Sequence, residues 1–166
     1  MSTSMGNDRP GDNIVVNGQG ALVVVGDVLV SAWRRPYQIE AIEDIARIVD
    51  AFDPDHRGAL SSLSIFRFER VRPADFADVA IRKRMVELSQ SCRFKIALNV
   101  LDGPGLVNST IRLGLAGMMS VLRMPYPVQT VGSVDGALQL LPTQTPSQRE
   151  AVLATIRSLE NQVWPK

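Results

Sequence analysis

The chain's only histidine closes a short acidic run that could, by residue type, hold a metal ion. Asp53, Asp55 and His56 fall within one four-residue stretch. Carboxylates and a neutral imidazole are ligands for divalent metals. However, donors confined to one loop after a helix, without further His or Cys nearby, are more typical of a polar turn. We therefore predict no metal site.

Nucleophilic chemistry has little more support. Ser109, His56 and an aspartate could be arranged as a catalytic triad, but no segment resembles the nucleophile elbow that exposes such a serine. The single cysteine, Cys92, follows Leu88 on one helical stripe, which favours a small buried side chain. It cannot form a disulfide within the chain, so we expect a reducing cytoplasm. We predict no enzymatic activity and no cofactor.

Phosphate groups, nucleic acid and membranes are also disfavoured. Asp102-Gly103-Pro104-Gly105 could offer backbone N–H groups to an anion, but it lacks the lysine and spacing of a phosphate-binding loop. The 18 Lys and Arg residues and 17 Asp and Glu residues give a formal net charge of +1. This balance provides no overall attraction for nucleic acid or an anionic surface. Gly26-Asp27 interrupts the most apolar stretch far short of the ~18 residues of a membrane span.

One local concentration of positive charge could still act as a surface. Eight basic residues fall between positions 67 and 95: Arg67, Arg70, Arg72, Arg82, Lys83, Arg84, Arg93 and Lys95. If they converge in space, they could dock an acidic protein surface or phosphate groups. Acidic residues interrupt the run, and a solvated helix face is the simpler interpretation.

The apolar pattern predicts the elements that must position these side chains. Runs at 21–25 and 28–33 around Gly26-Asp27 predict a β-hairpin, and Asn17-Gly18 offers an earlier turn behind Ile14-Val15-Val16. Periodicity and turn residues predict the rest: helices over 37–52, 73–91, 111–122 and from 134, and strands over 59–68, 94–101 and 127–131. The strand at 59–68 has serines on one face and Leu63 and Ile65 on the other, and either face could be buried.

A capped C-terminal helix should follow. Thr145-Pro146-Ser147-Gln148 combines a capping residue, a first-turn proline and a glutamine placed for a capping box. The apolar stripe of this helix must be buried against the chain's own sheet, on a second copy or on another protein. As an oligomer-forming helix it would use Val152, Ile156, Leu159, Val163 and Trp164.

The element order and the ending Val131-Gly132-Ser133-Val134-Asp135-Gly136-Ala137-Leu138 resemble the STAS domain of anti-sigma factor antagonists and sulfate-transporter tails. The similarity in order covers roughly residues 21–141, whereas the residues themselves match only in the final motif. It implies a single-domain α/β fold: a STAS-like mixed β-sheet with helices mainly on one face, plus an extra C-terminal helix. The expected segments are a flexible polar tail at 1–13, the STAS-like domain at 14–142 and a C-terminal helical extension at 143–166.

The resemblance also indicates where a switch would lie. In bacterial STAS regulators, a partner kinase phosphorylates a serine at the start of the helix after the third strand, which abolishes binding. By element order that segment is 69–76, which has no hydroxyl side chain; Asp75 could supply a fixed charge or be an ordinary first-turn acid. A competing alignment makes Ser109 and Thr110 candidate phosphorylation sites, but it leaves one helix and one strand unaccounted for.

We therefore expect a non-enzymatic regulatory or scaffolding module that binds another protein, either a kinase, a regulator or a scaffold component. Charge would steer this binding, and the expected contact residues are Arg70, Arg72, Asp75, Phe76 and Arg82. Two alternatives stay open. One is a sensor that holds a small apolar ligand or lipid between the sheet and the helix at 111–122. The other is a structural homo-oligomer, at its simplest a homodimer, joined by the C-terminal helix or an edge strand.

Overall fold

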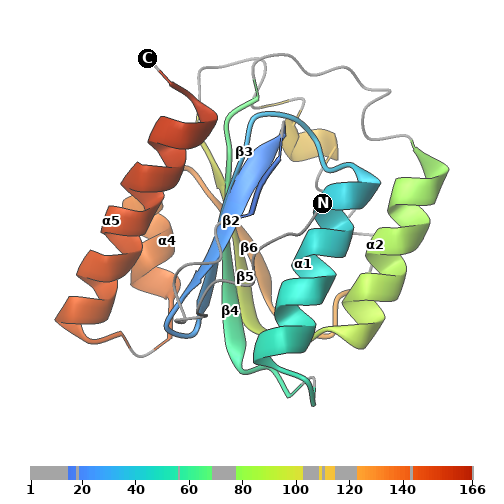
Figure 1. Ribbon diagram of the computed structural model, residues 1–166, viewed down its shortest axis with the longest axis horizontal. Coiled ribbons are helices and arrows are strands. Elements are labelled where there is room, and N and C mark those ends of the chain that lie inside the picture. The colour runs from blue at the N-terminus through green and yellow to red at the C-terminus, as the bar shows by residue number, and fades with distance from the viewer. Residues whose placement is uncertain are drawn as a thin grey trace, which may run out of the picture.

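The computed structural model describes residues 15–17, 19–55, 57–68, 78–102, 109, 111–114, 123–142 and 144–165, with the backbone alone for 15–17. The expected polar tail at 1–13 lies outside these residues. Within them, one mixed sheet of six strands has the order β1-β2-β3-β4-β5-β6: β1 Val15–Asn17, β2 Gly20–Val25, β3 Val28–Trp33, β4 Leu60–Phe66, β5 Phe94–Leu101 and β6 Val128–Val131. β1 to β3 pair antiparallel, and β3 to β6 pair parallel (Figure 1).

Two glycines shape the first hairpin. Gly26 has a φ of 60°, a left-handed conformation that glycine adopts without strain, and it begins the predicted turn between β2 and β3. At Gly20, a Cβ atom would lie 2.3 Å from the Ala32 carbonyl oxygen and 2.5 Å from the Trp33 ring. Because that oxygen belongs to the backbone of the paired strand, position 20 has room only for glycine.

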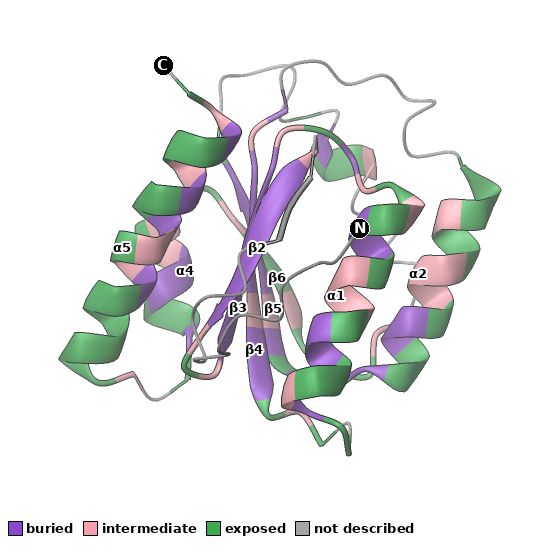
Figure 2. Cartoon of the chain, in the orientation of Figure 1, coloured by how far each residue is buried: buried purple, intermediate pink, exposed green. Residues whose placement is uncertain are grey.

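Helices cover both faces of the sheet (Figures 1 and 2). α1 Ile39–Phe52 and α2 Val79–Ser91 lie on one face, and α4 Val134–Leu140 and α5 Pro146–Val163 lie on the other. The predicted α/β class, the mixed sheet and the additional C-terminal helix are confirmed. The helices depart from the expected arrangement, because they divide between the faces rather than gathering mainly on one.

The strands themselves explain this division, because they carry apolar side chains at both alternating sets of positions. On the α5 side, Val30 and Leu63 belong to one core, whereas Leu29 and Phe66 belong to a second core beneath α1 and α2. A strand buried on two faces needs a covering layer on each. In β4 the serine-bearing face and the Leu63 face are therefore both covered.

The C-terminal helix is part of the domain core. It packs against β2 and β3, and its stripe is buried to a relative exposure of 4% or less: Val152, Ile156, Leu159 and Val163. Packing within the chain is thus confirmed for these side chains. They are not available to join two copies, and Trp164 packs beside them, partly buried.

Charged groups fix the end of this helix to the sheet. Arg67, which follows β4, pairs with Asp102 at 2.6 Å and with Glu160 of α5 at 3.1 Å. Its guanidinium carbon lies 4.8 Å from the centre of the Trp164 ring, a cation–π contact.

Capping side chains set where the helices begin. The Asp78 carboxylate accepts hydrogen bonds from the backbone N–H groups of Ala80 and Ile81 at 2.8 and 3.1 Å. The structure therefore starts α2 at Val79, later than the predicted residue 73, and residues 69–77 lie outside the described chain. The capping box of Thr145 and Gln148 at the start of α5 is confirmed.

The loop after α1 is organised by one buried carboxylate. Asp53 is 4% exposed and accepts hydrogen bonds from the backbone N–H groups of Arg57, Gly58 and Ala59 at 3.0, 2.8 and 3.0 Å. The side chain therefore satisfies backbone donors of a turn, whereas His56 lies outside the described residues. Within the described parts of the chain, no helix combines the length and apolar character that crossing a membrane requires.

Candidate ligand-binding pocket

A row of polar side chains crosses the sheet on the face that α1 and α2 cover. Strand register pairs Ser31 of β3 with Ser64 of β4, Ser64 with Asn99 of β5, and Asn99 with Thr130 of β6. Ser62 lies two residues before Ser64 and therefore on the same face. Polar side chains beneath a helical layer cost free energy unless they are hydrogen-bonded. The row is consequently the most unusual feature of this otherwise apolar layer.

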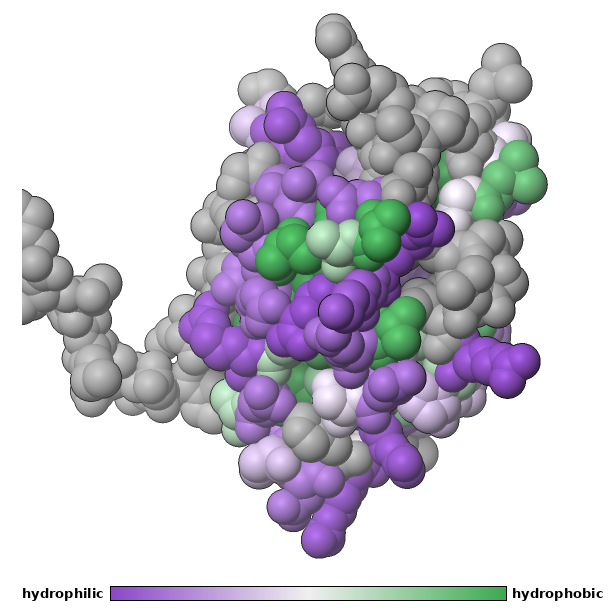
Figure 3. Space-filling view, turned by 90° about the vertical axis from the view of Figure 1, so that its right-hand side faces the viewer, coloured by the Kyte–Doolittle hydropathy of each residue, from purple (hydrophilic) through white to green (hydrophobic). Residues whose placement is uncertain are grey.

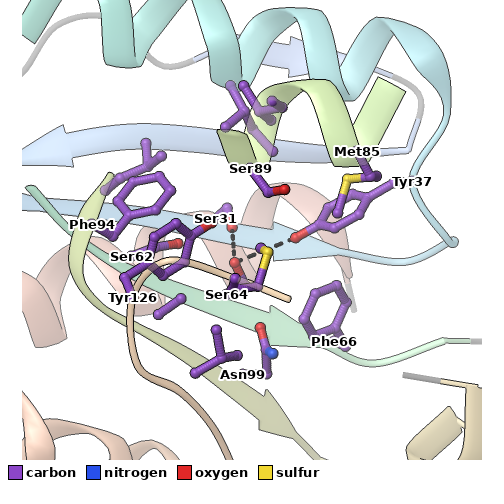
Figure 4. A pocket seen from close by; sticks show the side chains of 16 residues that line it. Ser31, Tyr37, Ser62, Ser64, Phe66, Met85, Ser89, Phe94, Asn99 and Tyr126 are labelled. Atoms are coloured by element: carbon purple, nitrogen blue, oxygen red, sulfur yellow. Dashed lines mark hydrogen bonds between the residues drawn. The ribbon is translucent and has the colours of Figure 1, made fainter. Parts of the chain in front are cut away.

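These side chains line a pocket of about 80 Å³. Apolar and aromatic side chains from α1, α2 and the segment before β6 complete its walls. In Figure 4, Ser64 and Asn99 project from neighbouring strands into one space that Met85 and Ser89 approach from α2. The lining residues are Leu29, Ser31, Tyr37, Ile45, Ser62, Ser64, Phe66, Met85, Leu88, Ser89, Phe94, Ala97, Asn99, Met124, Tyr126 and Val128.

The buried end of the row is connected by hydrogen bonds. Trp33 Nε1 donates to Ser31 Oγ at 2.8 Å, and Ser31 Oγ donates to Ser64 Oγ at 2.9 Å. The Tyr37 hydroxyl donates to Ser64 Oγ across a longer 3.4 Å. These bonds offset the desolvation of the two buried serines.

The other polar groups of the pocket are not engaged in this way. Within the described chain, no hydrogen bond is made by the side chains of Ser62 and Asn99 or by the hydroxyl of Tyr126. A carboxamide offers two donors and an acceptor, and each hydroxyl offers a donor and acceptors. The pocket thus presents hydrogen-bonding groups that a bound molecule could use.

Edge-to-face aromatic contacts fix two walls of the pocket. The rings of Phe94 and Tyr126 lie 5.3 Å apart at an interplanar angle of 88°. On the opposite side, Tyr37 makes similar contacts with Trp33 at 4.9 Å and with Phe66 at 5.5 Å. Such pairs are favourable and leave the rings little freedom, so these walls are largely preformed.

Burial keeps both tyrosines of the pocket neutral. Desolvation raises the pKa of Tyr37 to about 12, although its bond to Ser64 opposes the shift. Desolvation likewise raises the pKa of Tyr126 well above its usual range. Among the described lining residues none is Asp, Glu, His, Lys, Arg or Cys. The pocket can therefore form hydrogen bonds and bury apolar surface, but its lining offers no acid or base that works near neutral pH.

The expected partner-binding surface is only partly described. Arg70, Arg72, Asp75 and Phe76 lie outside the described residues, whereas Arg82 is exposed on α2. Seen from the side of the molecule on which α2 lies, the surface is mostly hydrophilic and its hydrophobic residues form small separate groups (Figure 3). The described part of this face therefore presents hydrophilic residues rather than a broad apolar patch.

Several of the clustered basic residues serve ion pairs within the chain. Arg84 binds both carboxylate oxygens of Glu43 at 2.6 and 2.9 Å, which connects α2 to α1 and lowers the pKa of Glu43. Lys95 binds Asp27 in the β2–β3 turn at 2.6 Å. Together with Arg67, these residues hold elements of the fold together, so Arg67, Arg84 and Lys95 are engaged in ion pairs within the chain.

The remaining predicted site residues lie away from the pocket. Ser109 is exposed, and Thr110 lies outside the described residues. Cys92 is 1% exposed, and burial raises the pKa of its thiol, which disfavours the reactive thiolate. The described residues contain no group of three His, Cys, Asp or Glu side chains that could hold a metal ion.

The ligand site considered from the sequence is only partly described. That site was expected between the sheet and residues 111–122, of which 115–122 lie outside the described chain. The observed pocket lies between the sheet and helices α1 and α2, on the face whose core includes Ile111. Its signal in the sequence was the alternation of Ser62 and Ser64 with apolar residues in a strand between two amphipathic helices. That pattern places polar groups beneath a helical layer, but it was compatible with a solvated face as well.

Comparisons with known proteins identify no relative: no family model, no curated protein and no solved structure matches the chain. The functional argument therefore depends on the fold and on the pocket.

Proposed function

We propose that this protein is a non-enzymatic binding domain that senses one small, uncharged molecule in the pocket between β3–β5 and helices α1 and α2. The observation that carries the proposal is the polar row of Ser31, Ser64 and Asn99, which opens into a cavity within an apolar layer. Apolar side chains would pack this layer more favourably. A concave apolar site with a few convergent polar groups is the usual form of a small-molecule site.

The lining supports binding rather than bond-making. Its titratable groups are phenols whose pKa values burial has raised, and general acid–base catalysis needs a group that exchanges protons near the working pH. An ionic ligand would also lose its hydration without gaining a counter-charge. The pocket is therefore suited to a neutral molecule that leaves unchanged.

Occupancy would connect the sheet to both helices that cover this face. Met85, Leu88 and Ser89 reach the pocket from α2, Ile45 reaches it from α1, and the strands supply its floor. A ligand that contacts all of them binds the folded state selectively, which raises the free energy of unfolding with the logarithm of one plus the ratio of ligand concentration to Kd. The position of α1 and α2 on the sheet would then report whether ligand is present.

Methionine methyl NMR spectroscopy tests the proposal directly. A library of uncharged fragments is added to protein labelled at the methionine methyl groups, and Met85→Leu and Met124→Leu identify the two pocket signals. We expect some fragments to shift both signals. Ala97→Phe, which fills the pocket from β5, should abolish these shifts, whereas Ala51→Phe at an exposed position of α1 should retain them. If no fragment shifts either signal, or if Ala97→Phe leaves the shifts intact, the proposal is wrong.

A STAS-like regulatory interaction is the second candidate. It is favoured by the exposed position of Arg82 and by the element order from β2 to α4 on which the resemblance depends. Capture of a defined partner, such as a kinase or regulator encoded nearby, should weaken in Arg82→Glu and persist in Asn99→Leu, which alters only the pocket. Equal capture by both variants and the native protein would count against this surface.

A further inference from the structure

The hydrogen bonds around Ser64 have a defined direction. An indole N–H can only donate, so Ser31 Oγ accepts from Trp33 Nε1 at 2.8 Å. Ser31 then gives its own hydrogen to Ser64 Oγ at 2.9 Å, and Tyr37 donates to the same oxygen at 3.4 Å. Ser64 thus accepts on both lone pairs and keeps its hydroxyl hydrogen for a further acceptor.

Within the described chain that hydrogen has no acceptor. The only bonds of the Ser64 side chain among those residues are the two in which it accepts. Ser64 is 5% exposed and lines the pocket, so the pocket is the space into which it can donate. A buried donor without a partner costs free energy, and a ligand acceptor would remove that cost.

Asn99 adds a second donor at the same place. It is paired with Ser64 in the register of β4 and β5, and both side chains line the pocket (Figure 4). Its carboxamide NH2 group carries two hydrogens and makes no hydrogen bond within the described residues. Two donors on neighbouring strands match the two lone pairs of one carbonyl oxygen.

The rest of the lining sets the charge and size of the ligand. Because no described lining residue is charged, an ionic group would be desolvated without a partner. The volume of about 80 Å³ is smaller than the engineered cavity of about 150 Å³ that admits benzene, which favours a ligand of about four to six heavy atoms. Met85 and Met124 can adjust to its shape because methionine side chains are unbranched.

We propose that the pocket binds an uncharged carbonyl compound, such as a small ketone, lactone or amide, whose oxygen accepts hydrogen bonds from Ser64 and Asn99. The apolar part of the ligand lies against Phe94, Tyr126 and Met85. This ligand chemistry rests on the proposed function of the pocket.

Three probes with one ring skeleton test the chemistry in the full-length protein: cyclopentanone, cyclopentane and cyclopentylammonium. Binding is followed through the methyl signals of Met85 and Met124. Cyclopentanone should bind at least as tightly as cyclopentane, although water solvates the ketone better, because the pocket replaces its hydrogen bonds. Cyclopentylammonium should not shift either signal.

Two variants identify the donors. Ser64→Ala and Asn99→Leu should each change the ratio of ketone to hydrocarbon affinity by about tenfold toward the hydrocarbon, as expected for one lost hydrogen bond. The ratio is measured within each variant, so general effects on stability cancel, and Asn99→Leu carries the test if Ser64→Ala does not fold. Preferred binding of cyclopentane, or a ratio unchanged in the folded variants, overturns the carbonyl proposal alone. No shift with any probe overturns the pocket function as well.

Discussion

Trp164 and Arg67 make two separate contacts with each other, a hydrogen bond and a cation–π contact. The indole Nε1 donates to the carbonyl oxygen of Arg67 at 3.1 Å, while the Arg67 guanidinium lies over the same ring at 4.8 Å. The two residues are 97 positions apart in the chain. Their contact therefore joins the end of α5 to the end of β4.

Removing parts of this contact should destabilise the fold measurably. Trp164→Phe keeps a ring but loses the hydrogen bond, and we expect the free energy of unfolding to fall by about 1 kcal/mol. Arg67→Ala should cost about 1–2 kcal/mol, a modest value because the side chain is partly exposed and its ion pairs are screened. Urea denaturation provides the measurement. Arg149→Ala, at an exposed position of α5, is the control and should change stability by less than about 0.5 kcal/mol.

Gly20 and Gly132 should respond in opposite ways to the same substitution. Gly20→Ala places a methyl group against the Ala32 carbonyl oxygen, so we expect a loss of about 2–3 kcal/mol or failure to fold. At Gly132 no atom lies within 4 Å of an added Cβ, and Gly132→Ala should be neutral or stabilise by up to about 1 kcal/mol. Thermal unfolding of the two variants distinguishes these outcomes. Equal effects at both positions would contradict the close approach in the hairpin.

Asp53 should be important for stability, and its neighbour Asp55 should not. Asp53→Ala removes the buried carboxylate that accepts hydrogen bonds from three backbone N–H groups of the loop, and we expect a loss of about 1–3 kcal/mol. Asp55 is exposed and contacts only Arg57 among the described residues, at 3.5 Å, so Asp55→Ala should change stability by less than about 0.5 kcal/mol. Chemical denaturation of both variants, with and without added Zn²⁺, tests the turn. Stabilisation by Zn²⁺ that depends on Asp53 would instead favour a metal site.

The two tyrosines should make the protein sensitive to alkaline pH. Because the pKa of Tyr37 rises from 10.0 to about 12 on folding, the folded state retains the phenolic proton more tightly than the unfolded state does. This contribution to stability, about 2–3 kcal/mol, is intact below pH 10 and is lost as the pH rises toward 12. Burial shifts the pKa of Tyr126 in the same direction.

Ultraviolet absorbance of tyrosinate measures this effect. The chain has two tyrosines, so the folded protein should show little tyrosinate between pH 10 and 11, where the urea-unfolded protein ionises. Tyr37→Phe and Tyr126→Phe assign the two titrations, and Tyr37→Phe should flatten the decline in stability. Ionisation near pH 10 in the folded protein would show that these hydroxyls are solvated.

Local patterns were sufficient to predict most elements. The strand at 94–101 matches β5 residue for residue, because its alternation and flanking turns are encoded by neighbours in sequence. The capping box before α5 and the turn at Gly26 were predictable for the same reason. The start of α2 was placed too early, since Pro73 is an acceptable first-turn residue, Asp78 is an acceptable N-cap, and the sequence does not rank the two starts.

The pocket and the covering of the second face depend on long-range pairing. Ser31, Ser64 and Asn99 are far apart in the chain, and only the parallel register of β3, β4 and β5 aligns them. Each one alone is compatible with a solvated strand face. Likewise, the stripe of α5 required a partner, but nothing in its own residues specified that β2 and β3 would provide it.

The position of α5 has a consequence for how the chain folds during synthesis. Ala21, Val23 and Val30 in the first hairpin share a core with α5, so every residue between the hairpin and α5 must leave the ribosome before that apolar surface is covered. Nascent intermediates would expose it until α5 emerges. Strands that emerge early and are covered late are targets for chaperones and a source of aggregation under stress.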